Sequence, residues 1–143
     1  MTPQELAEAC AAALYATDTA TRSLGITIGG VAPGRATAWM TVTGSMLNGH
    51  AIGHGGYVFL LADTAFAFAC NTYDRVTVAA GADVSFLEPA RPGDELTATA
   101  VERSRRGRSG LYDVTVSRAD GTVLAEFRGR SRSSTSPILG AGG

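Results

Sequence analysis

The sequence contains no lysine, and its 143 residues include only two histidines and two cysteines. Cys10 and Cys70 lie far apart and form no CxxC pair, so we expect neither a disulfide framework nor a metal site, and we expect a reducing, cytoplasmic location. The longest apolar run, about residues 57–70, is interrupted by Asp63 and Thr64 and falls short of the roughly 20 residues that a membrane span needs. The first ten residues carry acids and no basic segment, so we expect no secretory signal.

The overall composition is that of a globular protein. Hydrophobic residues make up 45% and charged residues 17% of the chain, which excludes a disordered or membrane-spanning class. We expect a single domain over residues 1–132, long enough to form a core and stabilised further by oligomerisation. The segment "SSTSPILGAGG", residues 133–143, is typical of a disordered tail.

The basic residues are all arginines and are unevenly distributed. Residues 1–100 carry four arginines and nine acids, whereas residues 101–143 carry eight arginines and four acids. Because the guanidinium group suits bidentate phosphate binding, the C-terminal part predicts an anionic partner. Nucleic acid is not expected, since no aromatic interleaving or nucleic-acid motif accompanies the arginines.

Local patterns predict helices in the first half of the chain and strands in the second. A capping box of Thr2 and Glu5, with proline at the first helical position, predicts a short helix over residues 3–18. Two strand-like runs follow on either side of Pro33-Gly34, and then comes an apolar helix over about 56–72. Alternation after that helix predicts a meander of three or four antiparallel strands. A helix that is apolar nearly all round must be wrapped by other elements, so we expect an antiparallel sheet curled around it, an α+β fold.

One carboxylate, Asp63, stands in this apolar helix. It shares a helical face with Phe59, Leu60, Phe66 and Ala67, and such surroundings raise the pKa of an aspartate toward that of a base active near neutral pH. Burial of a lone carboxylate costs on the order of several kcal/mol. The functional interpretation is that Asp63 activates water or attacks a carbonyl carbon itself. The structural alternative is that it caps a backbone group or pairs with an arginine across an interface.

The segment "LNGHAIGHGG", residues 47–56, leads into the helix. Gly55 and Gly56 open it, where free N–H groups can hold an oxyanion, although two glycines also permit a tight turn. His54 either orients a substrate, bonds the loop, or is an ordinary buried histidine. Asn48 fits an ordinary Asn-Gly turn, and His50 is interpreted as loop structure.

The spacing of His54 and Asp63 restricts how they can cooperate. They lie nine positions apart, which places them on opposite sides of the helix and about 13 Å apart along its axis. They cannot meet within one chain. If they act together, the loop of one subunit must face Asp63 of another.

The motif "LNGHAIGHGGYVFLLADTAFAFACN", with "FLEPARPGDELTATA" and "VLAEFRGRS" downstream, resembles PaaI-type acyl-CoA thioesterases of the hotdog superfamily. The similarity extends from about Leu24 to Arg132. It implies a hotdog fold, a dimer with paired sheets commonly assembled into a tetramer, and a shared active site. It also implies that Asp63 is the catalytic carboxylate and that Asn48 binds the carbonyl or the water.

The chain departs from that family at one place. Some relatives supply a serine or threonine from the strand after the helix, whereas residues 79–81 here are Ala-Ala-Gly. Thr64 or Thr77 is a substitute candidate, and Gly81 with Ala82 is predicted to leave space for an acyl group.

The resulting hypothesis is a homo-oligomeric thioesterase that hydrolyses a small acyl-CoA, with phenylacetyl-CoA or a ring-hydroxylated version as the leading substrate. Its catalytic residues are Asp63, Gly55, His54 and Asn48, and it needs no cofactor beyond the coenzyme A of its substrate. Core or interface packing is the alternative interpretation of Tyr57, Phe59 and Phe66, which are predicted to line an aryl pocket. A solvated basic turn is the alternative interpretation of Arg108 and Arg130, which are predicted to bind the nucleotide. The predicted substrate contacts are Gly56, Tyr57, Phe59 and Phe66 at the acyl group, Gly81 beside it, and Arg108 and Arg130 at the nucleotide phosphates. The rival functions are a non-catalytic acyl-CoA sensor and a hotdog hydratase or dehydratase.

Overall fold

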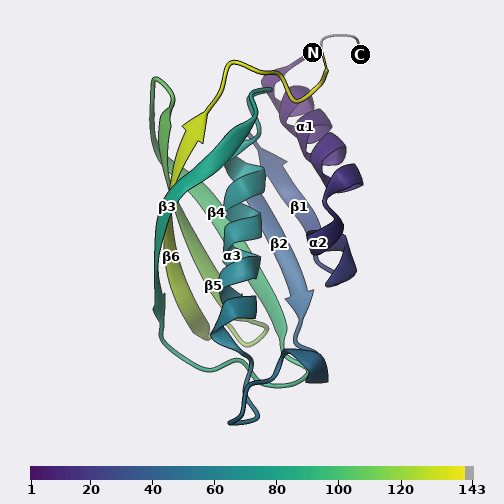
Figure 1. Ribbon diagram of the computed structural model, residues 1–143, viewed down its shortest axis with the longest axis vertical. Coiled ribbons are helices and arrows are strands. Elements are labelled where there is room, and N and C mark those ends of the chain that lie inside the picture. The colour runs from purple at the N-terminus through teal and green to yellow at the C-terminus, as the bar shows by residue number, and fades with distance from the viewer. Residues whose placement is uncertain (141–143) are drawn as a thin grey trace.

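Two consecutive helices form the start of the chain in the computed structural model, which describes residues 1–140 (Figure 1). Helix α1, Pro3–Thr17, begins at the predicted capping box: the Glu5 N–H donates to Thr2 Oγ1 at 3.0 Å, and the Thr2 N–H donates to Glu5 Oε1 at 2.9 Å. The side chain of Asp18 then accepts the Thr21 N–H and caps a second helix, α2, Thr19–Ser23. The sequence pattern does not indicate this second helix.

Six antiparallel strands form one sheet in the order β1-β2-β4-β5-β6-β3. Alternation predicts the buried faces of β2, β4, β5 and β6: Ala36, Ala38 and Met40 of β2, for example, are at most 2% exposed. It does not do so for β1 and β3, which have no buried residue. The predicted simple meander is wrong for β3, which pairs with β6 at the far edge of the sheet, because alternation specifies faces and not neighbours. The strands are β1 Thr27–Ala32, β2 Arg35–Thr41, β3 Thr77–Phe86, β4 Glu95–Arg106, β5 Ser109–Arg118 and β6 Val123–Ser133.

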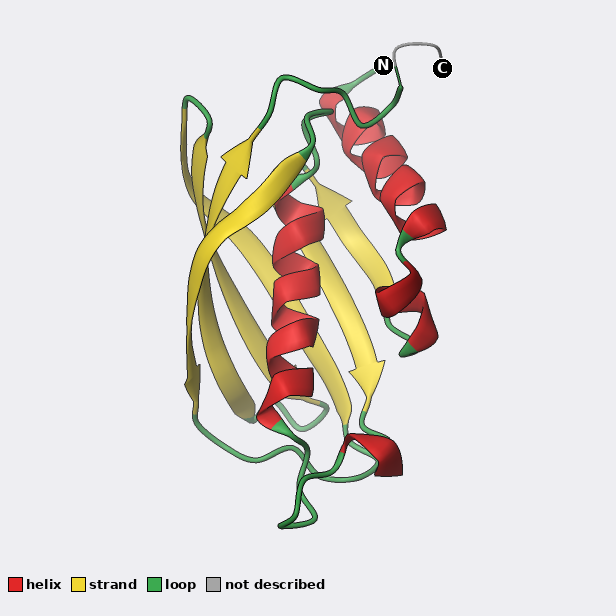
Figure 2. Ribbon diagram, viewed as in Figure 1, coloured by secondary structure: helices red, strands yellow, loops and turns green. Residues whose placement is uncertain are grey.

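The sheet curls around the central helix α3, Gly55–Cys70, as predicted (Figure 2). A short 3-10 turn, η1 Gly44–Met46, precedes the loop that leads into this helix. The helix ends two residues before the predicted boundary, because the Asn71 amide donates to the carbonyls of Ala67 and Thr77 and accepts the Thr77 N–H. No helix within residues 1–140 has both the length and the apolar character required to cross a membrane.

The core lies between α3 and the concave side of the sheet. Phe66 reaches the sheet and contacts Tyr112 and Phe127, with ring centroids 5.6 and 5.8 Å away. Gly129 makes this contact possible, since a Cβ there would lie 2.8 Å from the Phe66 ring. Glycine at this position therefore sets how closely α3 approaches the sheet.

Defined hydrogen bonds replace the predicted disorder after residue 132. Ser133 is the last residue of β6, and the Ser134 N–H donates to the Val76 carbonyl. The N–H groups of Ile138 and Leu139 both donate to Asp74 Oδ1, at 3.0 and 2.8 Å. These bonds give the segment up to residue 140 a fixed path, and the rest of the predicted tail, residues 141–143, lies outside the described residues.

Candidate active site

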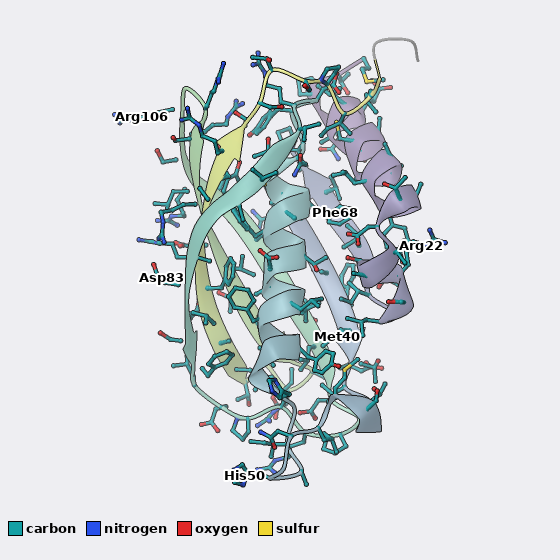
Figure 3. The ribbon with its side chains drawn as sticks, viewed as in Figure 1. Arg22, Met40, His50, Phe68, Asp83 and Arg106 are labelled. Carbon is teal, nitrogen blue, oxygen red and sulfur yellow. The ribbon has the colours of Figure 1, made fainter. Side chains whose placement is uncertain are left out.

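The loop that precedes α3 is built on Asn48. Its Oδ1 accepts the His50 N–H at 2.8 Å and the Ile52 N–H at 3.4 Å, so the predicted turn role of Asn48 is confirmed. Among residues 1–140, its Nδ2 donates no hydrogen bond and can reach a ligand. His50 extends from the loop away from α3, consistent with a purely structural position (Figure 3).

His54 is the N-cap residue of α3. Its Nδ1 accepts the Gly56 N–H at 2.9 Å, so a neutral ring carries its proton on Nε2 and presents that N–H as a donor. The side chain is exposed, and its ring meets Tyr57 edge-on at 6.3 Å. The buried-histidine alternative is therefore excluded, while the loop-bonding and substrate-orienting alternatives are compatible with each other.

Gly55 begins the helix with a free backbone donor. Within the described chain its N–H makes no hydrogen bond, and it lies at the end where the helix dipole favours negative charge. A Cβ at this position would lie 3.2 Å from Phe86 Cζ. Glycine thus lets the Phe86 ring lie directly over the start of the helix.

A pocket of about 310 Å³ opens at this place. Asn48 and Gly55 line it together with Phe86 and Leu87, which are both 55% exposed. Sequence reasoning missed these two residues, although they open the "FLEPARPGDELTATA" segment that carries part of the family resemblance. The pocket brings one amide donor, one backbone donor and an apolar wall together.

Asp63 does not line this pocket and lies farther along α3 on a different face. Burial raises the pKa of its carboxyl group, and no hydrogen bond or charged partner in the described chain opposes that shift. Within residues 1–140 the carboxyl group of Asp63 caps no backbone group, and the alternative of an arginine partner across an interface stays a prediction. The residues of α3 that share its incompletely buried face are Gly56, Tyr57, Phe59, Leu60 and Ala67.

The structure contradicts one predicted substrate contact, Phe66. Phe66 is 1% exposed and belongs to the core, where it packs against the sheet. A Cβ at Gly81 would lie 2.9 Å from Arg130 Nη2, the end of an exposed side chain, so the acyl space predicted beside Gly81 stays a prediction. Phe59 and Tyr57 remain on the half-exposed face of α3, and the Phe59 ring contacts Phe127 at 5.3 Å.

The two predicted phosphate-binding arginines are not brought together. The Arg130 Nη1 lies 2.9 Å from Asp83 Oδ2 on the outer side of the sheet, and both side chains are exposed. Arg108 lies in the β4–β5 turn and lines a cavity near the C-terminal end of α3. Residues 105–108 are thus at the end of the molecule opposite the loop of residues 47–56, as the labels of Arg106 and His50 show in Figure 3.

A long helix wrapped by a six-stranded antiparallel sheet, with a glycine-rich start and a lone half-buried carboxylate, defines a protein of the hotdog class. The sequence model of the thioesterase superfamily matches residues 50–125, and the chain belongs to that family.

Individual relatives agree with this assignment. The chain is 43% identical over 128 residues to the acyl-coenzyme A thioesterase PaaI of Escherichia coli strain K12, covering 90% of this chain and 91% of that protein. The structure of the E. coli PaaI protein from the phenylacetic acid degradation operon has a TM-score of 0.93 at 40% identity and covers 95% of this chain and 99% of that chain. A variant of the phenylacetic acid degradation protein PaaI from Thermus thermophilus has a TM-score of 0.77 at 33% identity, covering 80% of this chain and 98% of that chain.

Proposed function

We propose that this protein is an acyl-CoA thioesterase that hydrolyses small acyl-CoA thioesters to the free acid and coenzyme A. The observation that carries the proposal is that the chain presents both a free backbone donor, the Gly55 N–H, and a carboxylate, Asp63, whose pKa burial raises and no partner within residues 1–140 lowers. Aryl-acetyl groups such as phenylacetyl are the proposed acyl class, because the relatives are named for phenylacetic acid degradation and the pocket beside Gly55 has an apolar wall.

In this mechanism, the thioester carbonyl oxygen accepts the Gly55 N–H, and negative charge that develops on it is stabilised there. Asn48 Nδ2 and His54 Nε2, the polar atoms opposite those that accept loop N–H groups, are the proposed further donors to the carbonyl or the attacking water. Asp63 removes a proton from that water, or attacks the carbonyl carbon and forms an anhydride that water then cleaves. In both routes the thiolate of coenzyme A leaves and takes up a proton.

The site is proposed to form between two copies of the chain. Because His54 and Asp63 lie about 13 Å apart along α3 and on opposite sides, a carboxylate that acts together with His54 would come from a partner. A second copy would also cover the half-exposed apolar face of α3 and the apolar residues of β3, where Val78 is 60% and Phe86 55% exposed. We propose a homodimer of this kind, and a dimer of dimers as the full assembly.

Thiol release from a panel of acyl-CoAs tests this function. The wild type is expected to turn over phenylacetyl-CoA, and Asp63→Asn is expected to lower kcat by about 10²–10⁴-fold, the usual contribution of a catalytic acid or base. The circular dichroism of the variant serves as the folding control. Binding without turnover across the panel would refute hydrolysis and favour an acyl-CoA sensor. Interconversion of an enoyl-CoA and the matching 3-hydroxyacyl-CoA by addition or loss of water, without free thiol, would favour a hydratase or dehydratase.

The role of the Gly55 N–H is tested with two substitutions that add the same Cβ. Gly55→Ala keeps the N–H, whereas Gly55→Pro removes it at a first helical position where proline is tolerated. His54 has the extended conformation that precedes proline easily, with φ −61° and ψ 130°. We expect Gly55→Pro to lose about 10²–10³-fold in kcat relative to Gly55→Ala, and equal activities would contradict the oxyanion role.

A further inference from the structure

A second cavity lies at the C-terminal end of α3. It has a volume of about 360 Å³ and is enclosed by Cys70, the β4–β5 turn and the neighbouring ends of β3 and β6. Because α3 has 16 residues, this cavity is separated from the Gly55 pocket of the same chain by about 24 Å along the helix axis. The proposed catalytic steps use none of its residues, and only Arg108 among them is predicted from the sequence to contact a nucleotide phosphate.

The charged residues that line the cavity are all arginines: Arg75, Arg105 and Arg108. Arg105 is held in place, with its guanidinium carbon 3.5 Å from the centre of the Tyr73 ring and its Nε 3.7 Å from Glu102 Oε1. In the described chain, the side chains of Arg75 and Arg108 form no ion pair. The cavity therefore has an excess of positive charge in a protein whose net charge is −1.

The hydroxyl group of Ser131 also lines this space. Ser131 lines the cavity, is only 6% exposed, and makes no side-chain hydrogen bond within residues 1–140. Gly110 makes room for it, since a Cβ there would lie 2.5 Å from Ser131 Oγ. A hydroxyl that keeps access to the cavity and has no partner in the described chain, next to the guanidinium groups of Arg75 and Arg108, is suited to an oxygen-rich anion.

We propose that this cavity binds a phosphate group of a small phosphorylated ligand. Arg75 and Arg108 donate charge-assisted hydrogen bonds to the phosphate oxygens, and Arg105 supplies a fixed positive charge. The Ser131 hydroxyl donates a further hydrogen bond to the phosphate. Arg130, on the outer side of the sheet and paired with Asp83, does not take part.

Two sources of such a phosphate fit the geometry. If the reacting thioester lies over Asp63, the cavity of that same chain begins about 10 Å farther along α3, at Cys70, so the nucleotide phosphates of an acyl-CoA are one source. This source rests on the proposed function. A separate phosphorylated metabolite that binds as an effector is the other source, and it does not.

Direct binding tests the site independently of catalysis. Calorimetry would compare adenosine 3′,5′-bisphosphate with adenosine on the wild type, on Arg75→Gln/Arg108→Gln, and on Arg22→Gln/Arg91→Gln as the matched control for net charge. We expect the wild type to bind the bisphosphate with a Kd below about 1 mM and adenosine at least tenfold more weakly. The cavity variant should bind the bisphosphate at least tenfold more weakly than the control variant does. No bisphosphate binding, or equal binding by the two variants, would overturn the proposal.

Kinetics then identifies the source of the phosphate. A raised KM of the cavity variant for an acyl-CoA, but not for the matching acyl-N-acetylcysteamine thioester, identifies the substrate's own phosphate. A change in turnover of the truncated thioester on adding the bisphosphate to the wild type identifies an effector. Arginine-dependent binding in a protein that hydrolyses no thioester supports the site and refutes the proposed function. Thioester hydrolysis by a protein that shows no arginine-dependent binding of the bisphosphate supports the proposed function and refutes the phosphate site.

Discussion

The two faces of α3 have similar apolar side chains but very different surroundings. On the face toward the sheet, Leu61 and Ala65 are fully buried and Phe68 is 2% exposed. On the opposite face, Leu60 and Asp63 are only partly covered, and nothing else in the described chain packs over them completely. The first face is explained by the folding of a single chain. The second is apolar without being buried, which is the pattern expected of a surface that another molecule covers.

The largest effect that separates the two faces is expected from matched leucine truncations. Leu61→Ala should reduce the free energy of unfolding by about 2–5 kcal/mol at every protein concentration, because it leaves a cavity in the core. Leu60→Ala should reduce the free energy of unfolding less at low protein concentration and more at high protein concentration, because the contact that it removes forms only in the dimer. Urea unfolding over a hundredfold range of concentration measures both. A Leu60→Ala effect that does not depend on concentration would mean that no second copy covers this face.

A smaller effect is expected from the titration of Asp63. Burial raises the pKa of its carboxyl group in the folded state, so between the unfolded and folded pKa values the native state binds more protons than the unfolded state. The contribution to stability is therefore fully present below the unfolded pKa and is lost as pH rises through the folded pKa. Asp63→Asn removes this loss. The free energy of unfolding of Asp63→Asn, relative to that of the wild type, should therefore increase with pH between the unfolded and folded pKa values of Asp63.

Urea unfolding of both proteins from pH 3 to 8 measures this difference, in which the other titrating groups cancel. A difference that stays constant with pH, or that falls as pH rises, would show that Asp63 is not held in surroundings that disfavour its charge.

The parts of the fold that depend on local chemistry were predictable from the sequence. The capping box at Thr2 specified where the first helix starts, and the alternation around Ala38 specified which side of its strand is buried. The position of β3 beside β6 was not predictable in this way, because strand pairing follows from how the whole sheet closes around α3. The second helix, α2, is not predicted either, because it depends on the cap that the Asp18 side chain provides.

The candidate site divides in the same way. Gly55 and Asp63 could be selected from the sequence because a glycine at a helix start and a carboxylate in an apolar helix are unusual for their surroundings, whereas Asn48 is selected through the family resemblance. Phe66 could not be assigned correctly, because helical periodicity does not reveal that Gly129 makes room for its ring. The place of Phe86 over Gly55 depends on where β3 leaves the sheet, which only the structure gives.

The central claim is that the active site is completed by a second copy of the chain, and mixing two inactive variants tests it most directly. Asp63→Asn and Gly55→Pro would be unfolded together, refolded in equal amounts, and assayed for thiol release. In a shared site, half of the random dimers are mixed and each mixed dimer has one intact site, so the mixture should recover about one quarter of the wild-type activity. Activity that stays at the level of the separate variants, with mixed dimers confirmed by mass spectrometry, would contradict the account and place both groups in one chain.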